Sequence, residues 1–307
     1  GNSIGKYEYT EDIVIYAQWT PNTYTVSFND GQGTVYPTQT VVFDQNFVFP
    51  VPVKEDSVFF GWYSEAGGTG VQYTDENGHS VRVWDIPYDT TLYAQWPIDI
   101  SSYEDFEIIR TNPEGSYILT ADITLESDWT PIGPNADSPF TGILDGNGHT
   151  IYYTSIVSDF AGYVGFIGYN NGIIRNLNLG IKYIENGEIE IDRSGKAEID
   201  IIGQDDSYNI LYVGGLAGYN GADGVIVNCN IAAKISVVMM KDERDMMIGG
   251  VTGYNKGKIV NTYIVTEIDV EIDESVINPG NEYIGTIAGY HSSEALIDGC
   301  SYDRIVD

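Results

Sequence analysis

Tyrosines that recur at one repeat position are the side chains of this chain best placed to bind a ligand. They are Tyr169, Tyr219, Tyr254 and Tyr290. If the rings face outward, they form a ladder that suits sugar rings or a protein partner, because each ring offers an apolar face and a polar hydroxyl. The alternative is that the rings stack in the core or at a corner, where they only stabilise the fold.

Two segments alternate carboxylates with aliphatic residues, 188–192 (EIEID) and 267–273 (EIDVEID). Alternation of period two places the aliphatic side chains on one face of a strand and the carboxylates on the other. The simplest interpretation is a solvated strand face, and the alternative is a calcium ladder, since calcium takes clustered oxygen ligands. No Asp-x-Asp-x-Asp-Gly loop accompanies them, and 145–148 (DGNG) is explained as a turn. We therefore expect no cofactor, with calcium left open.

Catalytic patterns do not emerge from the remaining residues. His79, His149 and His291 are isolated, and none stands in His-Glu-x-x-His spacing. We expect His149 to cap a turn and His291 to replace the Asn of a repeat. The sequence has no Gly-x-Ser-x-Gly nucleophile motif and no phosphate loop. Carboxylates occur throughout, so their presence indicates no particular active site, and the sequence predicts neither a catalytic nor a metal site.

The charge of the chain restricts its partners and its setting. The 307 residues carry 45 acidic against 14 basic side chains, a net charge of −31, which repels nucleic acid and anionic membranes. A hydrophobic fraction of 42% with 24 tyrosines excludes a disordered acidic tail. No apolar run approaches the length of about 18 residues that a membrane span needs. We expect an extracellular monomer without membrane insertion in this chain.

A repeated phrase sets where these side chains lie. It reads GFIGYN at 165–170, GLAGYN at 215–220, GVTGYN at 250–255 and TIAGYH at 286–291. A second phrase follows each copy, with Asn176, Asn228, Asn261 or Gly299 at a constant position, spaced by 52, 33 and 38 residues. Fixed phrases with variable spacing indicate a stacked solenoid whose loops differ in length.

The pattern within each repeat predicts strands. Apolar residues alternate with small or polar ones and β-branched residues are common, so we expect a parallel β-helix over residues 115–307. Parallel crossovers make it right-handed. We expect the Gly-Tyr-Asn corners to adopt left-handed backbone conformations. The glycines of these phrases should also let neighbouring turns pack closely.

These phrases carry a family resemblance. GLAGYN followed by VIVNC (225–229) resembles the GLUG motif of bacterial surface proteins, and the lead-in WTPIG (129–133) with FTGILDGNGHTI (140–151) resembles the turn that precedes GLUG arrays. The resemblance covers about 190 residues. It implies a β-helix in a large secreted or wall-attached protein, a class that includes adhesins and some metallopeptidases. The motif is architectural and implies no reaction.

A second repeat occupies the other end of the chain. DIVIYAQW (12–19) returns as DTTLYAQW (89–96), with FFGWY (59–63) between them. Residues 22–96 resemble the Listeria–Bacteroides repeat, the class of the internalin B-repeats, which implies a small β-rich, β-grasp-like module. Trp19, Trp62 and Trp96 are expected core anchors. Residues 1–20 would be the end of a preceding repeat, so we expect a fragment of a longer protein, with the repeat module at 21–97.

Residues 98–114 are predicted to be a linker with a capping helix. Ser102 and Asp105 form a candidate capping box for a helix over 103–110, which would cover the apolar end of the β-helix and make the junction rigid. Cys229 and Cys300 share one repeat position, with Thr262 between them. Two turns of about 4.8 Å separate them by roughly 9–10 Å, too far for a disulfide, which needs Cα atoms within about 7 Å. We predict two buried, unlinked thiols.

Together these features predict a non-catalytic extracellular segment of an adhesin-like protein on the bacterial cell surface. The partner would be a protein or glycan of a host or neighbouring cell, and the long insertion at 182–210 is a candidate place for contact, since loops there vary without disturbing the turns. Two alternatives stay open. One is a carbohydrate-processing β-helix resembling a polysaccharide lyase or hydrolase, and the other is a calcium-dependent glycan-binding module.

Overall fold

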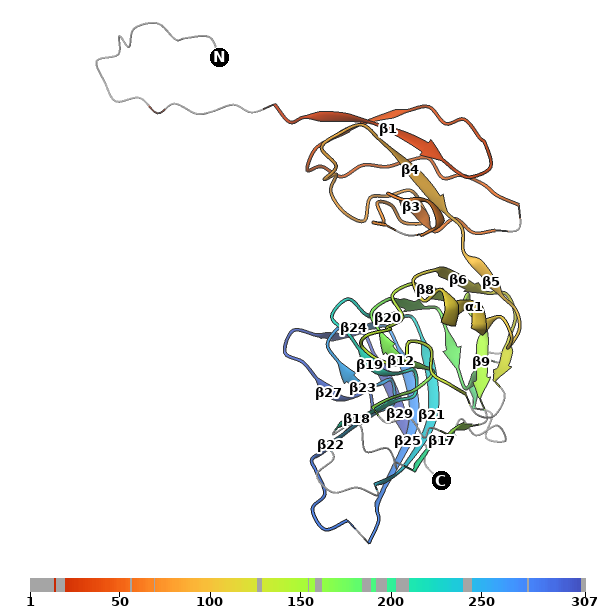
Figure 1. Cartoon of the computed structure of the whole chain (residues 1–307), viewed down its shortest axis with the longest axis vertical. Helices are drawn as coiled ribbons and strands as arrows, with labels where there is room; N and C mark the ends of the chain where they lie inside the picture. The colour runs from red at the N-terminus through yellow and green to blue at the C-terminus, as the bar shows by residue number, and fades with distance from the viewer. Residues whose placement is uncertain are drawn as a thin grey trace, which may run out of the picture.

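Strands make up nearly all of the regular structure in this chain (Figure 1). The computed structural model describes residues 14, 20–55, 57–68, 70–125, 129–153, 155–157, 162–183, 189–191, 198–202, 210–239, 245–274 and 276–304. The repeat remnant expected at 1–20, with Trp19, lies outside these residues apart from positions 14 and 20. The described part contains one α-helix and is all-β in class, as the sequence predicts.

The small module, residues 21–97, is a mixed four-stranded sheet in the order β2-β1-β4-β3. Its central strands β1 (Thr23–Asn29) and β4 (Thr90–Gln95) run parallel. The outer strands β2 (Gln39–Val42) and β3 (Gly61–Tyr63) are antiparallel to them. A short 3-10 helix, η1, follows at Ala66–Gly68.

The core of the small module is aromatic. Trp62 is fully buried, as predicted, and so is Trp84, which the sequence analysis did not single out. Trp96 is partly buried against the same core, and its indole Nε1 donates to the backbone oxygen of Asp30 at 3.0 Å. The rings meet mostly edge to face, for example Phe28 and Phe49 with centroids 4.9 Å apart.

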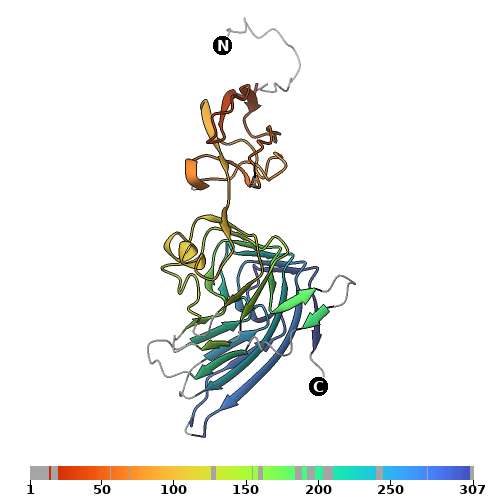
Figure 2. The same cartoon turned by 90° about the vertical axis from the view of Figure 1, so that its right-hand side faces the viewer.

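Residues 98–304 form a second body, here called the stacked unit, in which parallel strands lie above one another (Figures 1 and 2). From residue 163 onward, each turn of the chain passes in order through four sheets, which we call B, C, D and E. Sheet B contains β11 (Tyr163–Val164), β18 (Ile210–Gly214), β22 (Asp245–Gly249) and β26 (Glu282–Gly285). Sheet C contains β12 (Ile167–Asn170), β19 (Ala217–Asn220), β23 (Thr252–Asn255) and β27 (Ala288–His291).

The other two sheets begin earlier in the chain. Sheet D contains β5 (Ile98–Ile100), β6 (Ser116–Leu119), β8 (Ile143–Asp145), β13 (Ile173–Arg175), β20 (Val225–Val227), β24 (Lys258–Val260) and β28 (Leu296–Asp298). Sheet E contains β7 (Ile123–Leu125), β9 (Thr150–Tyr153), β10 (Ser155–Val157), β14 (Asn178–Leu179), β17 (Glu198–Ile202), β21 (Asn230–Met239), β25 (Tyr263–Ile272) and β29 (Ser301–Arg304). Strands β15 (Ile181–Tyr183) and β16 (Ile189–Ile191) form a separate antiparallel pair.

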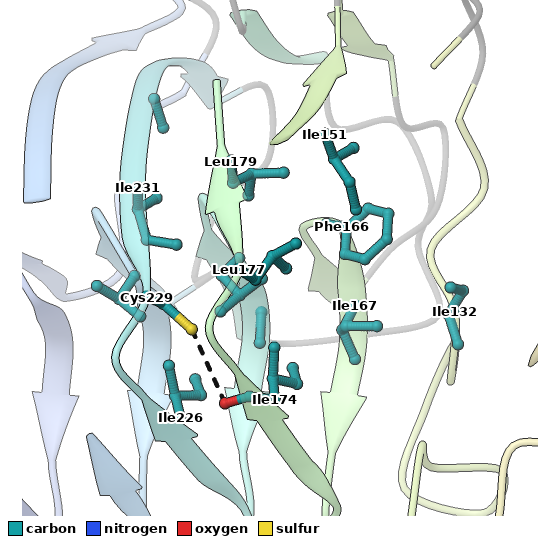
Figure 3. Packing of buried hydrophobic residues seen from close by; sticks show 14 of the residues in the cluster. Ile132, Ile151, Phe166, Ile167, Ile174, Leu177, Leu179, Ile226, Cys229 and Ile231 are labelled. Carbon is teal, nitrogen blue, oxygen red and sulfur yellow. Dashed lines mark hydrogen bonds between the residues drawn. The ribbon is translucent and has the colours of Figure 1, made fainter. Parts of the chain in front are cut away.

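The four copies of the repeated phrase stack in register. Tyr169 pairs with Tyr219, Tyr219 with Tyr254 and Tyr254 with Tyr290 along sheet C. Their aliphatic neighbours fill one continuous core between the sheets, part of which Figure 3 shows. These parallel sheets fit the arrangement expected of a β-helix.

Left-handed backbone conformations occur at a different corner from the one predicted. The expectation placed them at Gly-Tyr-Asn, but they lie in the second phrase, at Asn176 (φ 52°), Asn228 (φ 54°), Asn261 (φ 49°) and Gly299 (φ 63°). The glycines of the first phrase serve close approach instead. A Cβ on Gly218 would lie 2.6 Å from the backbone nitrogen of Val164 in the adjacent turn. The turn of the chain therefore depends on Asn, which tolerates this conformation better than most residues.

Helix α1 (Phe106–Thr111) lies at the end of the stacked unit nearest the small module (Figure 1). It begins three residues later than predicted. The carbonyl oxygens of residues 102–105 accept hydrogen bonds from backbone nitrogens three residues further along the chain, which is the spacing of turns and not of an α-helix. The carboxylate of Asp105 turns back and accepts from the backbone nitrogen of Ser102 at 2.9 Å, which is one half of the predicted capping box. Phe106 packs edge to face on Trp129 and Phe166, with centroids 5.3 and 5.6 Å apart.

The last turn is less well covered than the others. Ile248 is fully buried, whereas Ile284, its partner in the next strand of sheet B, is 50% exposed. The same contrast affects the cysteines. Both are unlinked, and Cys229 is buried, as Figure 3 shows, but Cys300 is only half-buried. The prediction that both thiols are buried is wrong for Cys300, since no described turn packs over it.

Candidate binding surface

The repeat tyrosines form a continuous ladder on sheet C. Adjacent ring centroids lie 4.6 Å apart from Tyr169 to Tyr219, 4.6 Å from Tyr219 to Tyr254 and 5.2 Å from Tyr254 to Tyr290. The rings are nearly parallel, with interplanar angles of 12°, 2° and 23°. This spacing follows from the distance between strands in a sheet, about 4.8 Å. The first three rings are half-buried and Tyr290 is 41% exposed, so the ladder is accessible from one side.

A second aromatic column runs beside the first on sheet B. Tyr163, Tyr212, Met247 and Tyr283 occupy successive register positions. Tyr163 and Tyr212 stack with centroids 5.1 Å apart. Tyr212 also meets Tyr219 edge to face, at 5.3 Å and 87°. Rings of the two columns therefore meet at right angles, and together the columns form what we call the tyrosine ribbon, which extends over sheets B and C. The ribbon combines both interpretations of the ladder, because the same rings stabilise the fold and reach solvent.

This second column was not predicted from the sequence. A signal for it was present, since a tyrosine or methionine stands six or seven residues before each ladder tyrosine. That spacing carries the chain from sheet B to sheet C in every turn, so the two positions recur together.

Three phenols of the ribbon have a raised pKa. Burial raises the pKa of Tyr169 and Tyr219, and burial together with the neighbouring tyrosines raises the pKa of Tyr212 to about 12. These phenols therefore keep their protons and present hydroxyls as donors and acceptors.

A column of buried asparagines holds the ladder in register from beneath. Asn170, Asn220 and Asn255 are fully buried. The Nδ2 of Asn170 donates to the Oδ1 of Asn220 at 2.8 Å, and the Nδ2 of Asn220 donates to the Oδ1 of Asn255 at 2.8 Å. His291 takes the fourth position, as predicted, with its Nδ1 3.5 Å from the Nδ2 of Asn255. Each amide uses its neighbour as a partner, so no polar group is lost by burial.

The alternating carboxylates do not converge in the described strands. In β25, Ile268 and Val270 pack toward the core while Asp269 and Glu271 are exposed. Lys234 pairs in register with Glu267, their charged groups 3.6 Å apart. Within the described residues no group of three His, Cys, Asp or Glu could hold a metal ion. The first alternating segment is described only at 189–191, and most of its carboxylates lie outside the described residues.

Two other candidate positions have simple structural roles. In the turn at 145–148, the Oδ1 of Asp145 accepts from the backbone nitrogen of Asn147 at 2.8 Å. The imidazole Nδ1 of His149 lies 3.3 Å from the Oδ1 of Asp122, whose same oxygen accepts from the backbone nitrogen of Thr150.

Most of the insertion at 182–210 lies outside the described residues. Its described part contributes β17, which pairs in parallel with β21 over five residues and with β10 on its other side. The insertion is therefore partly built into sheet E, which the sequence analysis did not predict.

Comparison with known proteins supports two classes of module in one chain. Residues 24–95 match the model of the Listeria-Bacteroides repeat domain, and residues 210–236 match the model of the GLUG motif. Both resemblances named from the sequence are confirmed, in the order stated. These are non-enzymatic domains of surface proteins, and they indicate a surface-associated protein.

The relatives share only part of their length with this chain. Internalin H of Listeria monocytogenes is 45% identical over 89 residues, which is 28% of this chain and 14% of that protein. A putative Gly-rich membrane protein of Evansella cellulosilytica is 32% identical over 99 residues, 30% of this chain and 10% of that protein. Halomucin of Haloquadratum walsbyi is 36% identical over 124 residues, 35% of this chain and 1% of that protein. No solved structure matches.

The described helices give no sign of a membrane span, since none is long and apolar enough to cross a bilayer.

Proposed function

We propose that this chain is a non-catalytic extracellular segment of a bacterial cell-surface protein, which presents a binding surface on a stalk. The small module is a β-grasp-like stalk repeat. The stacked unit is a right-handed parallel β-helix that carries the tyrosine ribbon. The ribbon contacts a glycan or protein of a host or neighbouring cell.

The observation that carries this proposal is the tyrosine ribbon itself. Its rings lie on one lateral face, are stacked at strand spacing and remain neutral at physiological pH. Tyrosine is a frequent binding residue because it supplies a large rigid contact area with few torsions and a hydroxyl. The match to internalin H of Listeria monocytogenes supports the extracellular setting.

The test is a screen of the purified chain on glycan and protein arrays, followed by substitution in the ribbon. We expect at least one array ligand. The double variant Tyr254→Leu/Tyr290→Ala should weaken its binding by about tenfold or more, since aromatic contacts at interfaces often contribute more than 1 kcal/mol each. Leucine at 254 keeps apolar bulk within the stack, and circular dichroism verifies that the strands persist.

The matched control is Tyr88→Ala, because Tyr88 is 62% exposed on the small module, away from the ribbon. Binding that is equal in the ribbon variant and the wild type would contradict the assignment of this surface. Turnover of a uronic-acid polymer by the purified chain, abolished by one carboxylate substitution, would contradict the non-catalytic assignment and support the lyase-like alternative.

A further inference from the structure

The tyrosine ladder has a regular spacing that a second copy of the same ladder would match. Adjacent ring centroids along it lie 4.6, 4.6 and 5.2 Å apart. Because the rings stack on one another, their flat faces are covered along the ladder, and a partner meets ring edges and hydroxyls. A sugar ring, which packs against an aromatic face, gains little there, whereas a row of side chains with the same strand spacing can lie against every ring.

A column of residues runs beside the ladder, along the corner between sheets C and D. In each turn one residue stands directly before the glycine or alanine that leads into sheet D. These residues are, in chain order, Asn171, Asp223, Lys256 and Glu294. The backbone shows that the positions are equivalent, because the nitrogen of Lys258 donates to the oxygen of Gly224, and the nitrogen of Leu296 donates to the oxygen of Gly257. We call this set the corner column.

The charged members of the corner column are exposed and lie beside the ladder. Asp223, Lys256 and Glu294 are exposed, and within the described residues none of them forms an ion pair. Gly221, in the same corner as Asp223, lies against the first ring, since a Cβ on it would be 2.9 Å from the Cε1 of Tyr169. Burial raises the pKa of Tyr169, and the charge of Asp223 raises it further. A partner that covers the ladder therefore also meets these charges.

A two-fold axis makes the corner column complementary to itself. The axis lies in the plane of contact, perpendicular to the ladder, and passes between Tyr219 and Tyr254. It places Tyr219 of one copy against Tyr254 of the second copy, and the two ladders run antiparallel. Asp223 then meets Lys256 of the second copy, and Lys256 meets Asp223, so one attractive contact forms twice. Two-fold dimers have interfaces of this kind, in which the same surface is used by both subunits.

The parallel orientation of two ladders is less favourable. It would bring Lys256 toward Asp245, which stands on sheet B two residues before Met247 and so on the same face. The Oδ1 of Asp245 already accepts from the backbone nitrogen and from the Nδ2 of Asn281, at 2.7 and 3.0 Å. Asp223 would lie opposite the aliphatic Ile210, which pairs in register with Asp245. The antiparallel orientation is therefore the one that gives Asp223 an opposite charge.

The net charge of the chain sets the conditions for such a contact. Two chains that each carry a charge of −31 repel one another at long range. Added salt shortens the screening length from about 30 Å at 0.01 M to about 3 Å at 1 M, so it removes this repulsion while contacts between touching groups persist. Pairing should therefore strengthen as salt is added, and at low salt the chain should remain the monomer that the sequence predicts.

We propose that the tyrosine ribbon pairs with the ribbon of a second copy of this chain, in an antiparallel two-fold dimer with two Asp223–Lys256 ion pairs. This inference rests on the binding function proposed above and names its partner as another copy of the same chain. The ladder tyrosines supply the area of contact, and the corner column fixes the orientation.

Sedimentation velocity of the whole chain, over a range of protein concentrations and at low, intermediate and high sodium chloride, measures the pairing. We expect a monomer at low salt and a monomer–dimer equilibrium at high salt. Larger species should not form, because a two-fold contact closes on itself. A chain that stays monomeric at every salt concentration would overturn the proposal.

Charge reversal tests the corner column at a salt concentration where the wild type dimerises. Lys256→Glu should raise the Kd of the dimer about tenfold or more, because it sets two like-charged contacts across the interface. Asp223→Lys/Lys256→Glu exchanges the two charges and should restore the Kd to within about threefold of the wild type. The matched control is Lys258→Glu, which changes the net charge equally at an exposed position on sheet D, outside the ribbon. The control should leave the Kd within about threefold of the wild type, and circular dichroism verifies that each variant is folded.

Two results of this series would contradict the arrangement. Equal Kd values for Lys256→Glu and Lys258→Glu would overturn the role of the corner column. Rescue of Lys256→Glu by Asp245→Lys, without rescue by Asp223→Lys, would overturn the antiparallel orientation.

The pairing and the proposed function fail separately. A chain that never dimerises, yet binds an array ligand less well as Tyr254→Leu/Tyr290→Ala, would overturn the pairing and leave the function of the ribbon intact. A dimer that forms equally well in that double variant would show that another surface makes the contact, which would also overturn the pairing.

Discussion

The asparagine column beneath the tyrosine ladder offers a sharp test of what holds the turns together. Asn220 is fully buried between Asn170 and Asn255 and makes an amide hydrogen bond of 2.8 Å to each. Asn220→Ala leaves the Oδ1 of Asn255 without its donor. The Nδ2 of Asn170 keeps only a longer contact of 3.3 Å to the backbone oxygen of Gly172. At about 1–3 kcal/mol for each orphaned group, with one partly satisfied, we expect a loss of about 3 kcal/mol in the free energy of unfolding.

Asn220→Asp makes the same position sensitive to pH. The introduced carboxyl keeps the size of the amide but, when ionised, has no hydrogen to donate to the Oδ1 of Asn255. Burial disfavours the charged form, so its pKa in the folded chain lies above the unfolded value of about 3.9. Its folded pKa is the raised one, so stability is greatest below the unfolded pKa and is lost as pH rises through the folded pKa. We expect the deficit relative to wild type to shrink between pH 7 and pH 4.5.

Urea unfolding followed by circular dichroism measures these differences, and hydrogen exchange of peptides from β19 and β23 localises them. The matched control is Asn228→Gly. Asn228 is exposed, its side-chain contacts are long at 3.4 and 3.5 Å, and glycine suits its φ of 54°. The control should stay within about 0.5 kcal/mol of wild type. An Asn220→Ala loss below about 1 kcal/mol, or no larger than that of the control, would refute the reasoning.

Three further predictions concern the thiols, the junction and the insertion. In native chain at pH 8, a thiol reagent should label the half-buried Cys300 and spare Cys229, whose pKa is raised to about 12 by burial; equal labelling of both would contradict the buried position of Cys229. Arg175→Leu should lower the free energy of unfolding by about 2–4 kcal/mol, since it leaves Asp145, only 7% exposed, without its ion partner. The same variant should be cleaved faster by a protease near Pro97, between the small module and the stacked unit. An unchanged cleavage rate would show that Arg175 does not hold the two parts together. Deletion of 184–197 should preserve the fold by circular dichroism and alter binding, whereas a deletion that also removes β17 should destabilise sheet E; equal stability of the two deletions would contradict the role of β17.

The repeated phrases predicted the sheets well, because strands that stack in register need similar residues at fixed positions. Ladder residues such as Tyr219 and Tyr254 recur because each pairs with its counterpart in the next turn, and this constraint is visible in the sequence. The aromatic anchors of the small module were also visible, as Trp62 shows.

The rest depended on contacts between different parts of the chain. Nothing in the residues around Arg175 indicates that its guanidinium meets the ring of Phe60, 115 positions earlier, so the contact between the small module and sheet D could not be predicted. Cys229 and Cys300 occupy equivalent positions, yet their exposure differs, because burial in a stack depends on what lies above. The left-handed position was assigned to the wrong phrase, since both phrases contain asparagine and only the backbone distinguishes them.

The parallel pairing of β1 with β4 has a consequence for how this chain responds to tension. The chain enters the small module at the start of β1 and leaves it at the end of β4, and these ends lie at opposite extremes of the parallel pair. Pulling along the chain therefore loads the hydrogen bonds between the two strands together, in shear, rather than opening them one after another. Only Trp96 and Pro97 separate β4 from β5, so the load passes almost directly into sheet D. A stalk module built in this way should unfold under force at the rate set by this one strand pair, which single-molecule pulling would measure.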